Sequence, residues 1–210
     1  MTSPRTFIAR HGETVFNAAA RLQGDHAHTP LTRAGFAQAD AMGETLAEHL
    51  GEKPALTLWA SDTGRALQTL AIVAEHLGLD WHAARTDPRL GEIGMGEWGG
   101  RYYKDVVGEA GAIFDRETGL FARKAPGGEW YDDIAARLRG WIDDTADETG
   151  DRLVIMHGMS SRVLRGMMTR AEVHPHFLAP VADGLEQGSM VVIQDGVETL
   201  IRRGTGYAPA

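Results

Sequence analysis

The chain has 210 residues, of which 43% are hydrophobic and 24% charged, with a net charge of −8 and no cysteine. This length suits one domain with a buried core, and we expect residues 1–210 to form a single domain. The acidic balance argues against a nucleic-acid partner, because basic surfaces bind phosphate backbones. The lack of cysteine excludes a disulfide framework, a thiol nucleophile and cysteine-ligated zinc.

The sequence also argues against a membrane partner. No apolar run approaches the roughly 20 residues that a membrane span needs. The first residues, 1–5, are not followed by an apolar signal core. We therefore expect a cytoplasmic protein.

Hydrophobic spacing and turn residues predict an alternation of strands and helices. In chain order we expect a strand at 6–9, a helix at 32–50, a strand at 56–60, a helix from Ser61-Asp62 to about 77, a strand near Trp81, a helix at 132–148, a strand at 152–156, a helix to about 169, and strands at 189–194 and 197–201. The last two flank Asp195-Gly196, a typical hairpin turn. Residues 101–131 have only a weak pattern, and we expect them to be an insertion of short helices and loops over the site.

This alternation predicts an α/β domain of three layers with a largely parallel sheet. Ligands of such sheets bind outside the carboxyl ends of the strands. Three polar clusters follow predicted strands directly, namely Arg10-His11, Ser61-Asp62 with Arg65, and His157-Gly158. Their positions are the first indication of a site at this edge.

Arg10-His11-Gly12 suits attack on a phosphoryl group. A neutral histidine with one bare ring nitrogen is a nucleophile near neutral pH. Arginine offers a planar, permanently charged fork to phosphate oxygens, and glycine lets the backbone approach closely. Because the tripeptide is short, a turn with a solvated arginine explains it equally well when it is taken alone.

Further residues along the chain support the phosphoryl-transfer interpretation. Arg65 is predicted near the start of a helix, where anions are favoured. Glu92 lies in the glycine-rich loop 90–100, and His157 ends a predicted strand. Glu97 is a nearby alternative to Glu92, and a strand-end histidine such as His157 is often only structural.

Together these motifs, in order from Arg10 to His157, resemble the histidine phosphatase superfamily of phosphoglycerate-mutase-like enzymes. The resemblance implies an α/β sandwich around a mostly parallel six-stranded sheet. It also implies that His11 is phosphorylated during turnover and that Glu92 donates and accepts the proton. The groups that the resemblance places on the phosphoryl group or the substrate are Arg10, Asn17, Gln23, Gly24, Arg65, His157 and Gly158.

The same chemistry predicts that neither a metal nor a cofactor is needed. Two arginines and a protonated His157 would supply up to three positive charges to the phosphoryl group. His26 with His28, and His174 with His176, have a spacing that metal ligands can have, but no carboxylate or third histidine is suitably placed in the sequence.

Residues around the predicted substrate depart from the family pattern. The acid loop reads Gly-Glu-Ile-Gly-Met-Gly-Glu-Trp from Gly91, whereas phosphoglycerate mutases tend to have an Asn-Glu-Arg-His-Tyr-like loop. This favours a phosphomonoester hydrolase acting on a small phosphorylated metabolite, with a cofactor-dependent mutase as the alternative. A non-catalytic binder of phosphorylated ligands and a metal-dependent hydrolase are the remaining hypotheses. The sequence leaves the substrate open, and it is equally compatible with a monomer and a homodimer.

Overall fold

The computed structural model describes residues 3–206. Its central sheet has six strands in the order β3-β2-β4-β1-β7-β8. Strands β3, β2, β4 and β1 are parallel to one another, whereas β7 pairs antiparallel with both β1 and β8. The strands are β1 (Thr6–Arg10), β2 (Leu56–Ala60), β3 (Arg85–Thr86), β4 (Asp151–Met156), β7 (Met190–Gln194) and β8 (Val197–Arg202). The expected mostly parallel sheet is confirmed.

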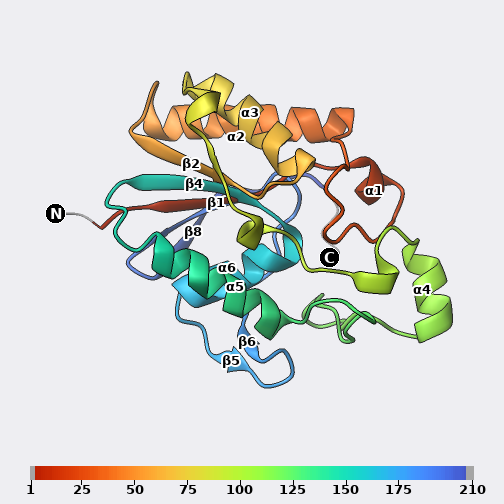
Figure 1. Cartoon of the computed structure of the whole chain (residues 1–210). Coiled ribbons are helices and arrows are strands. Elements are labelled where there is room, and N and C mark those ends of the chain that lie inside the picture. The colour runs from red at the N-terminus through yellow and green to blue at the C-terminus, as the bar shows by residue number, and fades with distance from the viewer. Residues whose placement is uncertain (1–2, 207–210) are drawn as a thin grey trace.

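Helices cover both faces of the sheet, which gives the three expected layers. In Figure 1, α2 (Arg33–Leu50) and α3 (Gly64–Leu77) lie on one face, and α5 (Tyr131–Asp144) and α6 (Gly158–Met168) lie on the other. Thr32 caps α2 because its side chain accepts a hydrogen bond from the Gly35 N–H.

Two hydrophobic cores lie between these layers, and successive side chains of β1 point alternately into one and the other. Phe7 and Ala9 pack with apolar residues of α2 and α3, whereas Ile8 packs with those of α5 and α6. All three side chains are fully buried. The strand that precedes His11 is therefore held from both sides.

Short elements occupy the ends of the sheet and the connections. They are α1 (Val15–Ala18), the 3₁₀ helices η1 (Trp81–Ala83), η2 (Pro88–Leu90) and η3 (Gly96–Trp98), α4 (Tyr103–Ala110), and the two-stranded sheet of β5 (Val173–His174) and β6 (Ala179–Pro180). The strand that was predicted near Trp81 lies a few residues further along the chain. Trp81 begins η1, and the strand is the two-residue β3, which pairs with the end of β2.

Parallel pairing brings the ends of three strands to one edge. Arg10 lies opposite Met156, and Ala60 lies opposite Ile155, so the next residues of each strand emerge together. Helices α1 and α4 lie near this edge in Figure 1. Within residues 3–206, no helix is both long enough and apolar enough to cross a membrane.

Candidate active site

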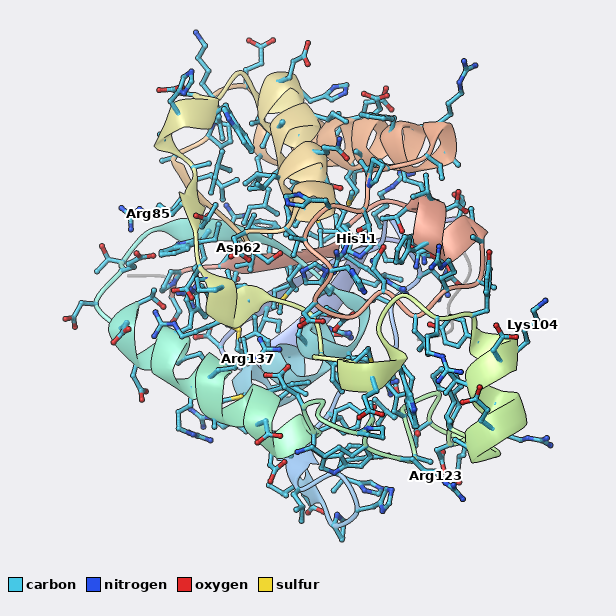
Figure 2. All side chains as sticks on the ribbon, turned by 45° about the vertical axis from the view of Figure 1, so that its right-hand side comes forward. His11, Asp62, Arg85, Lys104, Arg123 and Arg137 are labelled. Carbon is cyan, nitrogen blue, oxygen red and sulfur yellow. The ribbon has the colours of Figure 1, made fainter. Side chains whose placement is uncertain are left out.

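His11 lies directly after β1, and Figure 2 shows it near the centre of the molecule. Its side chain is 2% exposed. Nδ1 lies 2.7 Å from the carbonyl oxygen of Gly12, so Nδ1 carries the proton and Nε2 keeps its lone pair. Burial, followed by the charges of Arg65 and Arg10, lowers the pKa of His11 well below its usual value. The ring is therefore neutral and has the form that nucleophilic attack requires.

Gly12 fixes this loop because it touches the start of α2. A Cβ atom at Gly12 would lie 2.3 Å from the carbonyl oxygen of Gly35, and one at Gly35 would lie 2.1 Å from that of Glu13. The two backbones can meet this closely only where neither residue has a side chain. The contact places the Gly12 carbonyl, and hence the hydrogen bond that orients His11.

His157 follows β4 and lies beside His11, with the two ring centroids 5.1 Å apart. Its Nδ1 accepts a hydrogen bond of 3.2 Å from Arg65 Nε, so Nε2 carries the proton and donates it to Ser61 Oγ at 2.6 Å. Burial, followed by the charge of Arg65, lowers the pKa of His157 well below its usual value. The expected third positive charge is therefore absent from this structure, because a buried ring between cations is neutral.

Arg65 is fully buried at the start of α3. Its Nη1 donates to the carbonyl oxygen of His26 at 2.6 Å, and its Nη2 donates to that of Gly24 at 2.8 Å. Burial lowers the pKa of Arg65 to about 10. It makes no ion pair within the described residues.

Arg10 is 4% exposed and also lacks an ion pair in the described part of the chain. Nη1 donates to the carbonyl oxygen of Leu185 at 2.6 Å, whereas the buried Nε has no partner among residues 3–206. Gly158 makes room for this side chain, because a Cβ there would lie 3.3 Å from Arg10 Cζ. A buried guanidinium without a carboxylate is the arrangement that an anionic ligand completes.

The side chain of Glu92 lies near the Arg10 guanidinium and contacts the first turn of α6. Its carboxylate accepts hydrogen bonds from the backbone N–H groups of Ile93, Met159 and Ser160 at 3.0 to 3.1 Å. Glu92 also lines the pocket that contains His11, whereas Glu97 is an exposed residue of η3 and does not line it. Geometry therefore favours Glu92 over Glu97 as the proton carrier.

The pocket has about 370 Å³ of empty space, part of it open to solvent. The sequence-predicted residues that line it are Arg10, His11, Asn17, Gln23, Gly24 and Glu92. Thr14 holds two of these side chains, since its N–H donates to Asn17 Oδ1 at 3.0 Å and its Oγ1 donates to Gln23 Oε1 at 2.5 Å. Fixing the oxygens leaves the amide nitrogens of Asn17 and Gln23 as donors for a ligand. Arg65, His157 and Gly158 are not among the residues that line this pocket.

Apolar and aromatic side chains make up the rest of the lining, and the sequence did not identify them. They are Leu22, Ile93, Met95, Tyr103, Phe121 and Met159. Two of the six belong to the segment 101–131. The charged side chains Lys104 and Arg123 of the same segment lie at the outer edge of the molecule, away from His11 (Figure 2).

Two further polar residues support the site in ways that the sequence did not indicate. Ser61 belongs to the predicted cluster with Asp62 and Arg65, and its Oγ accepts a hydrogen bond from His157. Arg137 of α5 forms an ion pair with Glu129 at 2.9 Å, and its guanidinium also donates to the backbone carbonyls of Arg89 and Glu92. A charged residue in the middle of a helix gives no sequence signal for such a role.

Residues 6–194 match the model of the histidine phosphatase superfamily (branch 1). The chain belongs to this superfamily. The resemblance inferred from the motifs is confirmed, and so is the predicted fold. The relatives that are named phosphatases or mutases are enzymes.

Two relatives illustrate the range within the superfamily. A probable phosphoglycerate mutase GpmB of Yersinia pestis (strain Pestoides F) is 30% identical over 173 residues, 81% of this chain and 77% of that protein. The 6-phosphofructo-2-kinase/fructose-2,6-bisphosphatase of Caenorhabditis elegans is 33% identical over 156 residues, 73% of this chain. The match spans only 32% of the nematode protein, about a third of its length.

Solved structures of the superfamily share the fold. A mycobacterial glucosyl-3-phosphoglycerate phosphatase in complex with VO3 has a TM-score of 0.77 and 28% identity, over 94% of this chain and 97% of that one. Bacillus stearothermophilus YhfR has a TM-score of 0.72 and 25% identity, over 94% and 95% of the two chains.

Proposed function

We propose that this histidine phosphatase superfamily member hydrolyses small phosphomonoesters through a phosphohistidine formed on His11. The observation that carries the proposal is a buried, neutral His11 with a bare Nε2, in the same pocket as Glu92 and the unpaired guanidinium of Arg10. A solved structure with the same fold and 28% identity is that of a glucosyl-3-phosphoglycerate phosphatase, which supports the phosphatase assignment.

In the first half-reaction, His11 Nε2 attacks phosphorus, and the bond from phosphorus to the leaving oxygen breaks. The proton on the Glu92 carboxyl passes to that oxygen, which leaves as an alcohol. Arg10, Asn17 and Gln23 hold the phosphoryl oxygens. Gly158 leaves room for the Arg10 side chain, and the Gly24 carbonyl orients Arg65. The barrier falls mainly through positioning and neutralisation of charge.

We further propose that Arg65 and His157 join the phosphoryl group when it binds. A dianion beside His157 raises the pKa of the ring, so Nδ1 takes up a proton. The hydrogen bond from Arg65 Nε to His157 Nδ1 is then replaced by bonds from both groups to phosphoryl oxygens.

In the second half-reaction, Glu92 takes a proton from water, and the water oxygen attacks phosphorus. The bond from phosphorus to Nε2 breaks, which releases inorganic phosphate and restores His11. No step requires a metal, so the full activity is expected in excess chelator. Loss of activity with chelator would support a metal-dependent hydrolase instead.

The deciding experiment follows phosphate transfer to the protein. Rapid quenching after mixing with a ³²P-labelled phosphomonoester should yield an acid-labile, base-stable phosphoprotein, and the His11→Ala variant should remain unlabelled and inactive. Normal turnover by the variant would contradict the proposal. Binding of the phosphomonoester by the wild type with neither labelling nor phosphate release would favour a non-catalytic binder.

A phosphoglycerate mutase is the second candidate, because relatives about 30% identical have that name. The two activities differ in the acceptor of the phosphoryl group. Release of phosphate without interconversion of 2- and 3-phosphoglycerate would favour the hydrolase, and rapid interconversion would favour the mutase. Since small phosphorylated metabolites are kept inside cells by their charge, we propose a cytoplasmic location for either enzyme.

A further inference from the structure

The peptide group that joins Gly12 to Glu13 is hydrogen-bonded at both of its ends. Its carbonyl oxygen, on Gly12, lies 2.7 Å from His11 Nδ1 and accepts the proton of the ring. Its N–H group, on Glu13, donates to the side-chain oxygen Oε1 of Gln38 at 2.7 Å. The carbonyl and the N–H of a trans peptide point in opposite directions. A partner that fixes the N–H therefore also fixes the direction of the carbonyl that His11 contacts.

Gln38 is the only polar side chain on the buried face of α2. That face consists of Gly35, Gln38, Ala39, Met42, Gly43 and Leu46. Gln38 is 7% exposed, and burial of an amide costs free energy unless the amide forms hydrogen bonds. Gly188, which has a φ of 75°, makes room for it, because a Cβ atom there would lie 2.9 Å from Gln38 Cβ. The fold thus accommodates an amide at the point where α2 meets the loop that contains His11.

The other N–H groups of this loop have different partners. That of His11 donates to the carbonyl oxygen of Met156 at 3.0 Å. That of Gly12 donates to Thr69 Oγ1 of α3 at 3.2 Å. Because a backbone N–H can only donate, the atom of Gln38 that faces the loop is the oxygen. Strand β4 and helix α3 hold the preceding peptides, and Gln38 holds the peptide whose carbonyl orients the ring.

This peptide decides which nitrogen of His11 is bare. A neutral imidazole can carry its proton on either nitrogen, and the partner of one nitrogen selects the form. With the Gly12 carbonyl directed at Nδ1, the proton stays there and the lone pair is on Nε2, the atom that would attack phosphorus. If the peptide turned, Nδ1 would lose its acceptor. Part of the population would then carry the proton on Nε2, which cannot attack.

The same peptide acts on the charge that develops during transfer. When the Nε2 lone pair forms the bond to phosphorus, the electrons of the broken bond go to the leaving oxygen, and the ring gains one positive charge that Nδ1–H shares. A charged donor makes a stronger hydrogen bond than a neutral one. Donation from the Glu13 N–H to Gln38 polarises the Gly12 carbonyl and improves it as an acceptor. The contribution of Gln38 is therefore larger in the transition state than in the substrate complex.

We propose that Gln38 is a positioning residue for the nucleophile. Through the peptide between Gly12 and Glu13, it keeps Nε2 of His11 bare and stabilises the ring as it becomes charged. This inference rests on the proposed phosphohistidine mechanism and adds to it a residue of α2, a helix that contributes no side chain to the lining of the pocket that contains His11.

The test removes the acceptor and measures the tautomer. ¹⁵N NMR of histidine-labelled protein distinguishes a protonated ring nitrogen from a bare one, and the resonances that are missing from His11→Ala identify His11. The wild type should have a protonated Nδ1 and a bare Nε2. Gln38→Met keeps the length of the side chain without its acceptor, and a second form with the proton on Nε2 should appear. An unchanged tautomer in this variant would overturn the proposal.

Kinetics separate positioning from binding. In a single turnover, the rate of ³²P-labelling should fall about tenfold in Gln38→Met, the effect of losing one buried hydrogen bond. The Kd of inorganic phosphate should change little, because the arginines are untouched. Gln38→Glu keeps an oxygen acceptor in either protonation state and should restore most of the rate. Equal losses in Gln38→Glu and Gln38→Met would show that the acceptor does not matter, and would contradict the positioning role.

Gln68→Met is the matched control. Gln68 of α3 also accepts a hydrogen bond from a backbone N–H, that of Leu31 at 3.0 Å, but outside the loop that contains His11. Its replacement should leave the tautomer of His11 unchanged, and a second tautomer there would show a general loosening of the site and overturn the proposal. Gln38→Asn, whose amide is one methylene shorter, should behave like Gln38→Met and takes its place if that variant does not fold.

The tautomer is measured without turnover, so this inference and the proposed function can fail separately. A shifted tautomer in Gln38→Met supports the positioning role even if the wild type forms no phosphohistidine. Labelling at the same rate in the wild type and in Gln38→Met, with one tautomer in both, would refute the role of Gln38 and leave the proposed function intact.

Discussion

The tautomer of each histidine is set by partners that carry no negative charge. His11 donates to a backbone carbonyl, and His157 donates to the hydroxyl of Ser61 while accepting from Arg65. Neither ring has a carboxylate partner within the described residues. Both imidazoles are therefore neutral before substrate binds, and negative charge has to arrive with the phosphoryl group.

Ser61→Ala tests the importance of this hydroxyl. The change leaves the buried Nε2–H of His157 unpaired, which should lower the free energy of unfolding by about 1–3 kcal/mol and kcat by about tenfold. Denaturant unfolding and steady-state kinetics measure both effects. Ser160→Ala is the matched control, because the buried Ser160 Oγ has no partner in residues 3–206 and should tolerate the change. Equal effects of the two substitutions would contradict this role for Ser61.

Two helices on the same face of the sheet fasten the loop that contains Glu92. The first turn of α6 holds the carboxylate through the N–H groups of Met159 and Ser160. Arg137 of α5 holds the backbone of the loop, and its partner Glu129 also accepts from the Gly94 N–H at 2.8 Å. The position of the acid thus depends on the packing of α5 against α6.

Arg137→Met should displace Glu92 without removing it. We expect kcat for alkyl phosphates to fall about tenfold, because protonation of a poor leaving group depends on the placement of the acid. The loss should be much smaller for 4-nitrophenyl phosphate, whose leaving group needs little protonation. Arg139→Met, an exposed residue of the same helix, is the control. Equal losses on both substrates would indicate a general structural defect instead of a positioning role.

The long elements could be predicted from the sequence because each has a full apolar period, as in α2 and β4. The two-residue strand β3 was predicted only approximately, near Trp81, and β5 and β6 were not predicted, since so short a segment shows no periodicity and forms through its neighbours. The same division holds within the candidate site. His11 and Arg65 were predicted from motifs that follow strands, and Glu92 from a glycine-rich loop. The carbonyl of Leu185 that binds Arg10 is backbone, so no residue type indicates it.

At the scale of the whole molecule, the two buried histidines couple stability to pH. Their pKa values are lowered from 6.5 in the folded state, so the unfolded chain binds more protons once the pH falls below about 6.5. The free energy of unfolding should then decrease by up to about 2.7 kcal/mol per pH unit from these two groups. Above about pH 7.5 both states are neutral at these rings, and this contribution vanishes.

Urea unfolding between pH 7.5 and 5.5 measures this slope. His11→Asn should reduce it by about 1.4 kcal/mol per pH unit, the share of one histidine. His82→Asn, at an exposed position, should leave it unchanged. An unaltered slope in His11→Asn would show that His11 is protonated in the folded protein, which would also weaken its assignment as the nucleophile.

The central position of β1 has a consequence for the lifetime of the proposed phosphohistidine at His11. The strand is paired on both sides, with β4 and β7, and its side chains are buried in both cores. Amide hydrogens in such a strand exchange with solvent only when the whole domain unfolds. Water therefore has no route to the phosphorylated ring by local opening of the sheet, and it arrives through the pocket. The dwell time of the intermediate is then governed by the side chains of that pocket, Tyr103 and Phe121 among them.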